Sequence, residues 1–543
     1  MKRFLWLGFV LLLHLICTGC GDTFRPIIIP NPPTFPNPAA AHSVVAISDN
    51  GTTVAGSVMV IDVSGDSIAS VADCTTPLCI GIAPVHAVQQ TAGQVLVVNQ
   101  SGSLSKVNFS SITTIANTTT ITLPAGSAPN FVAVAPNQTT AYVTLPNLNE
   151  VGVVNTSSNV LTSTITVGSN PSDLAVTPDN TKLYVANNGT LCGNPPTPCS
   201  FSVSAFNTVG PSSRSISGSS LSSPPLWLSA RSDSQVVYVL EANGTLAYIS
   251  ITSTAGPDTL TESTISIPNA TTMIYDGNKN RLYIPGGQKM AIVDVTGPVP
   301  QLMKTVPIPP FSLLNLASVP GTAVAAAALP DGSRAYVGSY AALPSQVNIS
   351  SVLGDGTTGT YAYTLTAGHD LTPGVTVTVT GTDTQQVSGF DGTYIVSAIV
   401  SGTTSCPGTC FQTSNPTDTK GTTYPVSGLG TGSNLFPQVS VVDVLSNFIT
   451  KTIGVNGFPD ATIQNLPNGL PDPNYVPVCV NNRFRFMMAA GGNSSRAYLS
   501  SCDGGNVDII DTSNDTYNGS LSAPPGSRVN NPPQNPVFLF AGP

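Results

Sequence analysis

Charged side chains are scarce in this chain of 543 residues. Asp, Glu, Lys and Arg together make up 8% of it, whereas soluble domains average about 25%. Ser, Thr, Asn and Gly take their place, which predicts a neutral, hydrogen-bonding surface. Nucleic-acid phosphates are bound by clustered Lys and Arg, and the chain has 18 such residues and a net charge of −9. We therefore expect no nucleic-acid partner.

Histidine is also rare, with 4 in the chain, and no familiar catalytic motif is present. There is no Gly-x-Ser-x-Gly, no His-Glu-x-x-His and no glycine-rich phosphate loop after a strand. His369 followed by Asp370 could suggest a general base, but no partner nucleophile lies nearby in the sequence. A turn role is favoured for this pair. We predict no catalytic residue and no cofactor, and enzymatic activity stays an open question with "no" as the favoured answer.

The chain lacks an apolar run long enough to cross a membrane, but it begins with a shorter one. Lys2 and Arg3 precede an apolar stretch at 4–16, and small residues follow it. A transmembrane helix needs about 20 residues, so residues 1–20 are predicted to be a cleaved export signal. An ordinary soluble secretory signal is the alternative to the lipoprotein signal described next.

The end of this signal resembles the bacterial lipobox. Gly19 and Cys20 close it, with Cys17 where the motif usually has Leu. The resemblance implies that Cys20 is the first mature residue and carries a lipid that holds the protein at a membrane. Residues 21–40 are rich in proline and predict an extended tether. Because Gly21 rather than Asp occupies the second mature position, similarity to the bacterial sorting rule favours the outer membrane, on its periplasmic or its surface face.

The remaining cysteines predict disulfides. Eight are left in the mature chain: Cys74 and Cys79, Cys192 and Cys199, Cys406 and Cys410, Cys479 and Cys502. Pairs at short spacing around proline or glycine turns suit disulfides in an exported protein. Zinc is the competing interpretation, but no two-residue Cys spacing occurs and the histidines are scattered. We predict four disulfides and no metal site.

A repeat organises the chain. Residues 129–136 and 171–178 share a pattern at an offset of 42 residues, and each is followed by a short Tyr-Val strand. A repeat of this length, built from short apolar alternations and turn residues, is the signature of a β-propeller blade.

The tyrosine position of the repeat can be followed along the chain. It falls near 45, 96, 142, 184, 238, 283, 336 and 498. The first unit lacks an opening strand, and residues 535–540 look like an opening strand with nothing after it. We predict an all-β propeller of eight four-stranded blades, closed by the C-terminal strand. Seven blades is the alternative, if the unit around 83–125 packs irregularly.

Acidic or amide residues recur where a second kind of strand ends. They are Asp62, Asn155, Asp294, Asp443 and Asp511. Repeated carboxylates could line a metal or substrate site, but Ser, Thr, Gly or Asn follows each within a few residues. Capping of the next turn is the favoured role.

These strings resemble the YVTN-type β-propeller repeats of bacterial and archaeal cell-surface proteins. The resemblance covers most of 41–350 and 436–543, and is clearest from Pro129 to Asn187. It implies a propeller fold. Its members include surface-layer proteins, lactonases and oxidoreductase subunits, so it leaves the function open.

One stretch interrupts the repeat. Tyr336 and Tyr498 are 162 residues apart, although one unit needs about 45. The surplus, 351–435, resembles small β-modules inserted in phage-tail and bacterial surface proteins. We therefore expect a signal at 1–20, a tether at 21–40, a propeller at 41–350 and 436–543, and an inserted β-domain at 351–435.

Two functions are compatible with this organisation. The first is a lipid-anchored binding or structural protein of the cell envelope, whose partner would be an envelope protein or a glycan. The second is a lactonase-like propeller hydrolase. Carboxylates clustered at one end of the central channel would favour the hydrolase, whereas an apolar or hydroxyl-lined channel would favour binding.

Overall fold

The computed structural model describes residues 42–542 apart from 76, 193–196, 253–255, 312–317, 355–359, 366–370, 372–375, 381, 383–389, 391, 404–405, 415–422, 460–475, 480–484 and 528–531. The predicted signal, Cys20, the tether and the pair His369–Asp370 lie outside the described residues. Within the described part, no helix is long and apolar enough to span a membrane.

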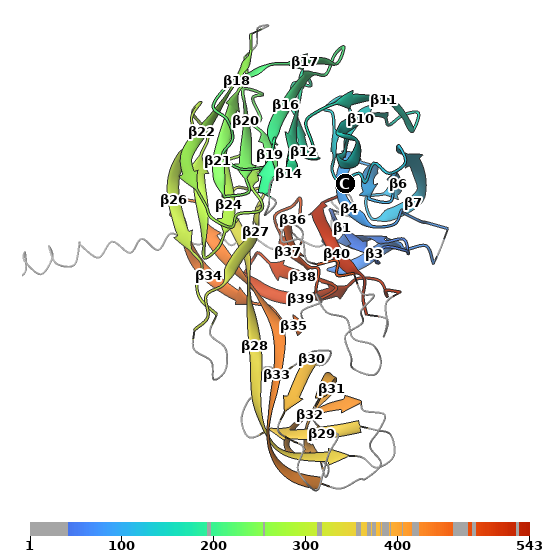
Figure 1. The fold of residues 1–543 in the computed structure, drawn as a ribbon, viewed down its shortest axis with the longest axis vertical. Helices are drawn as coiled ribbons and strands as arrows, with labels where there is room; N and C mark the ends of the chain where they lie inside the picture. The colour runs from blue at the N-terminus through green and yellow to red at the C-terminus, as the bar shows by residue number, and fades with distance from the viewer. Residues whose placement is uncertain are drawn as a thin grey trace, which may run out of the picture. The chain divides into compact units, whose positions relative to one another are not determined.

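The chain folds almost entirely into β-strands, as predicted. In the described part they form eight sheets of four or more strands and one two-stranded hairpin. The sheets follow one another in chain order, from blue to red in Figure 1. This succession of antiparallel sheets resembles that of a β-propeller.

The bounds of the strands in the first four sheets are as follows. The first sheet contains β1 (Ser43–Asp49), β2 (Ser57–Asp62), β3 (Ser67–Ala72) and β40 (Asn535–Ala541). The second contains β4 (Pro84–Thr91), β5 (Gln94–Asn99), β6 (Ser103–Ser111) and β7 (Thr114–Thr122). The third contains β8 (Val132–Val134), β9 (Thr140–Leu145), β10 (Glu150–Asn155) and β11 (Val160–Thr166), with the 3-10 helix η1 (Pro146–Leu148). The fourth contains β12 (Pro171–Val176), β13 (Lys182–Asn187), β16 (Ser202–Asn207) and β17 (Ser212–Arg214), beside the hairpin β14 (Thr190–Cys192) and β15 (Thr197–Cys199).

The other four sheets continue the series. The fifth contains β18 (Ile216–Gly218), β19 (Pro225–Ala230), β20 (Val236–Glu241), β21 (Thr245–Ser250) and β22 (Asp258–Ser266). The sixth contains β23 (Ile274–Asp276), β24 (Arg281–Gly286), β25 (Lys289–Asp294) and β26 (Gln301–Pro307). The seventh contains β27 (Thr322–Ala328), β28 (Arg334–Gly354), β33 (Thr423–Asp443) and β34 (Phe448–Gly454), with the additional strands β29 (Thr360–Leu365), β30 (Thr376–Thr380), β31 (Gly392–Thr403), β32 (Cys406–Ser414) and β35 (Phe458–Pro459). The eighth contains β36 (Phe486–Ala490), β37 (Arg496–Ser501), β38 (Asn506–Asp511) and β39 (Thr516–Ser522).

Burial follows the position of a strand in its sheet. Every residue of β13 is buried, whereas β39, at the outer edge of its sheet, alternates between exposed and half-buried residues. A strand covered on both faces reads as a continuous apolar run, and a half-covered strand alternates. The repeated tyrosines lie in the second strands of their sheets, and this position explains their burial. The fully buried ones are Tyr184, Tyr238, Tyr283, Tyr336 and Tyr498.

The last strand of the chain completes the first sheet. β40 pairs antiparallel with β1, with Val45 opposite Phe540 and Ile47 opposite Phe538. This is the pairing that the missing opening strand of the first unit predicts. Strands that begin each sheet pack in order, β40 against β4, β4 against β8, β8 against β12 and β12 against β19, and β36 packs against both β27 and β40. Among the described strands, no single sheet closes on itself. The unit at 83–125, the one for which the seven-blade alternative expects irregular packing, forms a four-stranded sheet with register shifts in two of its ladders.

The surplus residues of the seventh unit lie between its second and third strands. β28 and β33 pair from Arg334 opposite Asp443 to Leu353 opposite Thr423, and β29 to β32 lie between them in sequence. Figure 1 shows β28 and β33 leaving the other sheets side by side. A separate apolar core forms around Tyr363, whose ring stacks on Phe411 with centroids 4.7 Å apart. These strands still belong to the compact unit 41–543.

The acidic residues at strand ends cap turns, as predicted. Asp62 accepts hydrogen bonds from the N–H of Ser64 at 2.9 Å and from its hydroxyl at 2.7 Å. Asn155, Asp294, Asp443 and Asp511 accept bonds from backbone N–H groups two or three residues later. These side chains are therefore structural.

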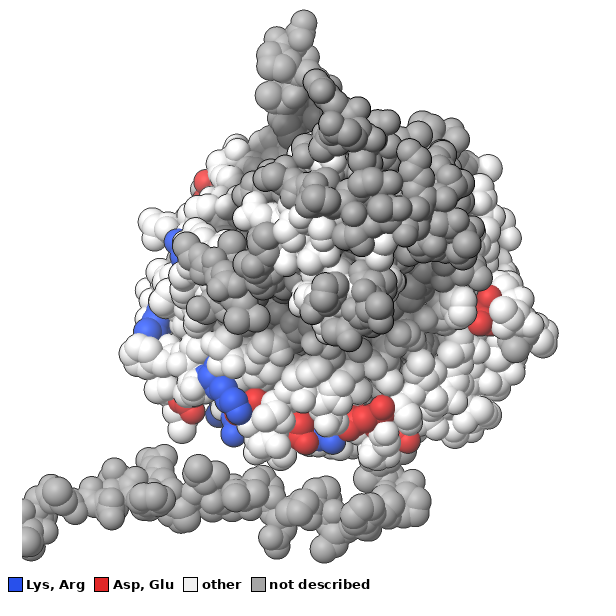
Figure 2. Space-filling view, turned by 90° about the horizontal axis from the view of Figure 1, so that it is seen from below, with Lys and Arg blue, Asp and Glu red and all other residues white. Residues whose placement is uncertain are grey.

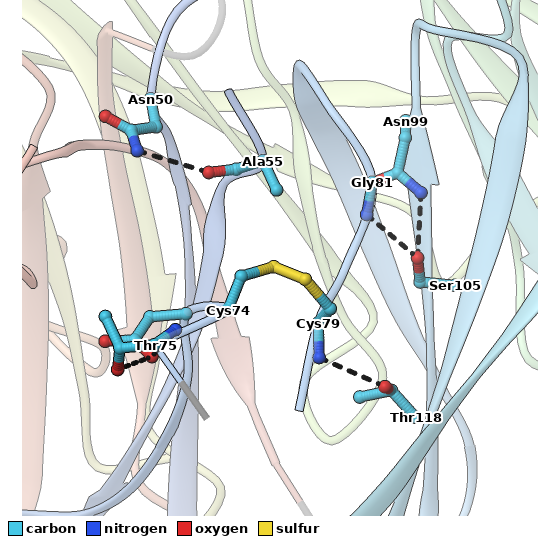
Figure 3. Close-up of a disulfide and its surroundings, with 10 residues drawn as sticks. Asn50, Ala55, Cys74, Thr75, Cys79, Gly81, Asn99, Ser105 and Thr118 are labelled. Carbon is cyan, nitrogen blue, oxygen red and sulfur yellow. Dashed lines mark hydrogen bonds between the residues drawn. A yellow bond between two sulfur atoms is a disulfide. The ribbon is translucent and has the colours of Figure 1, made fainter. Parts of the chain in front are cut away.

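Three of the predicted disulfides are present. They join Cys74 to Cys79, Cys406 to Cys410 and Cys479 to Cys502. Figure 3 shows the first of them bridging the segment between β3 and β4. Cys199 is also disulfide-bonded, whereas the side chain of its predicted partner, Cys192, lies outside the described residues.

Candidate functional site

The strands that begin the sheets start with a shared local motif. A proline stands two residues before each of five residues: His86, Phe131, Asp173, Trp227 and Phe538. Proline has no N–H to donate to a strand partner and is confined to strand starts, edges and bulges. The ladder shifts register between Pro84 and His86, between Pro171 and Asp173, and between Pro225 and Trp227. A β-bulge of this kind changes the direction in which the following side chain points.

Four of these five residues form an aromatic cluster, namely His86, Phe131, Trp227 and Phe538. The rings of His86 and Phe131 are stacked with centroids 3.7 Å apart, and His86 lies 4.3 Å from Phe538. The rings of Phe131 and Trp227 meet edge to face at 6.4 Å. These rings come from four different sheets, so the cluster joins the starts of their first strands. Each such pair contributes about 0.5–1.5 kcal/mol beyond area burial.

The rings differ in how far they are covered. His86, Phe131 and Phe538 are 4%, 8% and 7% exposed, whereas Trp227 is half-buried. The Nδ1 atom of His86 accepts a hydrogen bond from the N–H of Val132 at 3.4 Å. In this arrangement Nδ1 carries no proton and Nε2 is the protonated nitrogen.

Asp173 is the acidic residue among the five. Its Oδ1 accepts a hydrogen bond from the N–H of Leu174 at 2.6 Å, and its Oδ2 accepts one from the N–H of Leu228 at 3.3 Å. The carboxylate is fully buried and links β12 to β19. It is therefore engaged with backbone amides of two neighbouring sheets.

The inserted strands leave the sheets at the end where the cluster lies. Tyr340, at the point where β28 extends beyond its sheet, pairs with Thr322 at the start of β27. Its ring stacks on Phe486, the first residue of β36, at 4.9 Å, and the guanidinium of Arg485 lies 5.6 Å from it. First strands begin at this end in every sheet, so the module (β29 to β32) emerges at the same end as the aromatic cluster.

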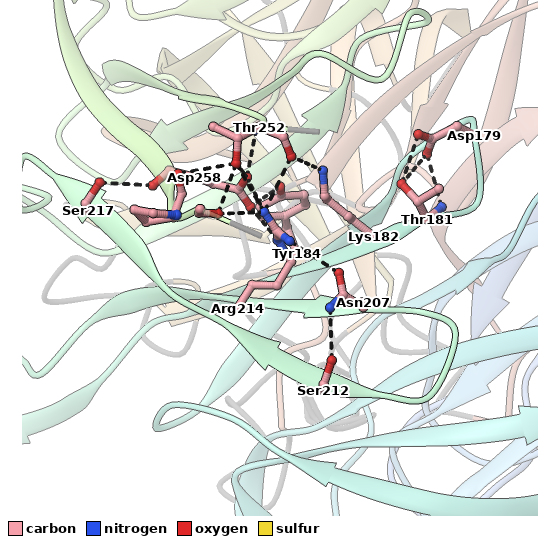
Figure 4. Close-up of polar contacts among 12 residues, drawn as sticks. Asp179, Thr181, Lys182, Tyr184, Asn207, Ser212, Arg214, Ser217, Thr252 and Asp258 are labelled. Carbon is pink, nitrogen blue, oxygen red and sulfur yellow. Dashed lines mark hydrogen bonds and ion pairs between the residues drawn. The ribbon is translucent and has the colours of Figure 1, made fainter. Parts of the chain in front are cut away.

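A polar network at the opposite end of the fourth and fifth sheets is structural (Figure 4). The carboxylate of Asp258 accepts hydrogen bonds from Tyr184 Oη at 2.8 Å, Arg214 Nη2 at 2.9 Å and the N–H of Thr252 at 2.9 Å. Burial acts to raise the pKa of Asp258, but the bonds from Arg214, Thr252 and Tyr184 outweigh it and hold this pKa low. Burial and the nearby carboxylate raise the pKa of Tyr184. Asp258 is fully engaged, so it ties two sheets together.

Carboxylates do not gather into a metal site in the described part of the chain, where no three His, Cys, Asp or Glu side chains lie close enough to hold an ion. Figure 2 shows a mostly uncharged face, in keeping with the 8% of charged residues. Our reading of the sequence missed the aromatic cluster. The signal that could have shown it was the proline two residues before an aromatic residue at the start of successive units.

Comparison with known proteins adds little to this geometry. No protein-family model and no curated protein matches the chain. Among solved structures, AztD from Citrobacter koseri is 10% identical, with a TM-score of 0.47 over 92% of this chain and 98% of that one. Hydrazine synthase from Kuenenia stuttgartiensis is 13% identical, with a TM-score of 0.40 over 79% and 96%. A predicted 6-phosphogluconolactonase from Bacteroides uniformis is 12% identical, with a TM-score of 0.38 over 55% and 88%. Likeness at this level carries no inference about activity.

Proposed function

We propose that the chain is an exported, lipid-anchored β-propeller that binds a ligand of the cell envelope at the end where the module emerges. The fold assigned in this proposal is a closed ring of eight YVTN-type blades. The eight sheets and the pairing of β40 with β1 support it. Pairing of strands from the two ends of the chain removes exposed sheet edges and fastens a propeller ring.

The proposed location rests on the N-terminal sequence and on the cysteines. A basic start, a 4–16 apolar stretch and Cys20 support export and lipid attachment, with the outer membrane as the destination. Disulfides such as Cys479–Cys502 support an oxidising compartment, because they are rare in reducing cytosol.

The aromatic cluster is the observation that carries the binding role. Trp227, the half-buried ring of the cluster, would offer a ligand its rigid apolar face and its indole N–H, while the buried ring of Phe131 packs against it and the buried rings of His86 and Phe538 complete the cluster. Charged residues make up 8% of the chain, and Figure 2 shows a mostly uncharged face, so a neutral polar ligand with apolar faces fits best. We assign an envelope glycan as the ligand class. The module at the same end would add loops to this binding face.

The lactonase-like alternative would need several carboxylates at this end. Three carboxylates lie near this end, Asp173, Glu241 and Glu262, and each already accepts hydrogen bonds from backbone N–H groups. The described geometry therefore favours binding over hydrolysis.

Tryptophan fluorescence offers a direct test. The chain has two tryptophans, Trp6 in the proposed signal and Trp227. The tryptophan fluorescence of the mature protein would therefore come from Trp227 alone. Titration with a panel of neutral envelope oligosaccharides should change its emission saturably. Phe131→Leu should weaken that binding by roughly 2- to 10-fold, because it removes the edge-to-face contact that helps to position Trp227.

The matched control is Phe448→Leu, an exposed aromatic on β34. Its binding should equal that of the unaltered protein. Failure of every oligosaccharide to change Trp227 emission would refute the glycan assignment, and equal effects of the two substitutions would refute the cluster as the site.

A further inference from the structure

Two glutamates form a carboxyl pair in the fifth sheet, close to the aromatic cluster. Glu241, the last residue of β20, is fully buried, and Glu262 on β22 is half-buried. Both bind the segment that leads into β19. Glu241 Oε2 accepts hydrogen bonds from the N–H of Ser223 at 2.7 Å and from the hydroxyl of Ser222 at 3.2 Å. Glu262 Oε1 accepts one from the N–H of Ser222.

No cation neutralises this pair in the described residues. The groups that act on the titration of Glu241 are Ser222, Ser223 and Glu262, and none is a Lys, Arg or His. On the neighbouring elements, Asp173 faces β19 from β12, and Asp258 lies at the far end of β22, paired with Arg214. Burial and the nearby Glu262 therefore make ionisation of Glu241 costly.

The pair holds the chain segment that positions Trp227. Ser223 precedes Pro224 and Pro225, and the N–H of Ala242, next to Glu241, donates to the Pro224 carbonyl at 2.8 Å. Pro225 then lies opposite Glu241. Proline has a fixed φ torsion. Because two prolines follow Ser223, a displacement of Ser223 should also displace Trp227.

We infer that the Glu241–Glu262 pair is a proton-operated switch that sets the position of Trp227 and thereby the affinity of the ligand site. This inference rests on the proposed binding function. Protonation of Glu241 weakens it as an acceptor for the Ser223 N–H and removes its repulsion from Glu262. Ionisation does the reverse: it strengthens the bond from Ser223 and pushes the two side chains apart, so the segment leading to Trp227 shifts. A protein of the envelope meets the pH of its surroundings, so such a switch would couple ligand binding to external acidity.

Burial, together with Glu262, raises the pKa of Glu241 to about 7. The transition should therefore fall near neutral pH. The test is the emission of Trp227 between pH 5 and 9 in ligand-free mature protein. A reversible change with a midpoint near pH 7 is expected in the unaltered protein.

Two substitutions probe the pair from opposite sides. Glu241→Gln resembles the protonated state and should hold the low-pH emission throughout. Glu262→Gln replaces the repelling partner with a neutral amide, so the transition should move to lower pH, while burial of Glu241 still keeps its pKa raised. Either variant alone suffices if the other fails to fold. Asp508→Asn, a change of a buried carboxyl in the eighth sheet, is the control and should keep the transition.

The outcomes separate the switch from the ligand assignment. Because the titration contains no ligand, it can succeed even if no glycan binds. Emission that stays constant from pH 5 to 9, or a transition that stays unchanged in both glutamine variants, would overturn the switch. A transition abolished only by Asp508→Asn would overturn it as well.

Discussion

Arg496 in the eighth sheet forms a bidentate ion pair with Asp66, which lies in the turn between β2 and β3 of the first sheet. Arg496 Nε lies 2.9 Å from Oδ1 and 3.0 Å from Oδ2 of Asp66, and Nη2 lies 2.9 Å from Oδ2. The two residues are 430 positions apart. Asp66 has a φ of 47°, the left-handed conformation that Asp and Asn tolerate best among residues with a β-carbon. The turn between β2 and β3 thereby presents its carboxylate to the eighth sheet.

The same arrangement joins other neighbouring sheets. Arg334 Nη1 binds Asp515 at 2.9 Å, and Arg281 Nη1 binds Asn447 at 3.0 Å. Each basic residue stands two positions before the buried tyrosine of its unit. Each acceptor lies four positions after a turn-capping Asp of the next sheet. The pair at the chain ends is thus one instance of a contact that repeats between successive sheets.

Arg496→Ala should destabilise the whole protein. It removes three charge-assisted hydrogen bonds and leaves a largely buried carboxylate, so the free energy of unfolding should fall by about 2 kcal/mol. Urea unfolding followed by circular dichroism measures this change. Lys451→Ala is the control, because Lys451 is exposed and donates to one carbonyl. Equal effects of the two substitutions would show that the ion pair does not hold the chain ends together.

Removal of residues 533–543 should lower the stability by about 5 kcal/mol or more, because β40 carries Phe538 and Leu539 into the core. Thermal unfolding of the truncated and full-length proteins is the measurement. Removal of Pro543 alone serves as the control and should change little. A melting temperature within a degree or two of the full-length value would contradict the closed ring.

Replacement of residues 352–434 by a short Gly-Ser linker should leave the remaining sheets folded. The module has its own core around Tyr363 and Phe411, and the seventh sheet keeps its four strands through the pairing of Ala335 with Val442. Circular dichroism and cooperative unfolding of the deletion protein would check this. Loss of the whole β-signal would show that the module belongs to the core of the other sheets.

Asp508 should make the stability depend on pH. Burial raises its pKa from 3.8 to about 7, and Oδ2 of the fully buried side chain has no hydrogen-bond partner in the described structure. The folded protein therefore binds a proton that the unfolded chain releases near pH 4. This stabilisation is complete below about pH 4 and is lost as the pH rises through 7, a change of about 4 kcal/mol.

The comparison that isolates this effect is between the unaltered protein and Asp508→Asn. The difference in their unfolding free energies should shift in favour of the variant between pH 4 and pH 8. Ser501→Ala keeps the carboxyl but removes a hydroxyl that lowers its pKa, so the pH dependence should persist and extend to higher pH. A difference independent of pH would mean that Asp508 is ionised in the fold.

Cys20→Ala should release the protein from the membrane fraction. The expectation follows from the lipobox-like ending of the signal, because the thiol of Cys20 is the proposed point of lipid attachment. Fractionation of cells followed by immunoblotting measures it. Unchanged membrane association would rule out Cys20 as the anchor.

The local features of the fold could be predicted from the sequence. The buried tyrosines repeat because a second strand is covered on both faces, and this leaves a readable apolar pattern. The capping Asp residues follow from turn chemistry within a few positions, as Asp62 and Ser64 illustrate. The pairing of β40 with β1 was predictable because the first unit lacks an opening strand, whereas residues 535–540 look like an opening strand with no unit after it.

The relationships across sheets were decided by tertiary structure alone. His86 and Phe538 meet through strands 452 positions apart, and Asp173 of the fourth sheet accepts a hydrogen bond from Leu228 of the fifth. Arg496 and Asp66 likewise become partners only when the first and eighth sheets lie side by side. Strand periodicity and turn chemistry act over a few neighbouring residues, so they determine each sheet from its own segment. Which side chains from different sheets come together depends on how the sheets pack. Local sequence patterns carry no information about contacts between residues so far apart in the chain.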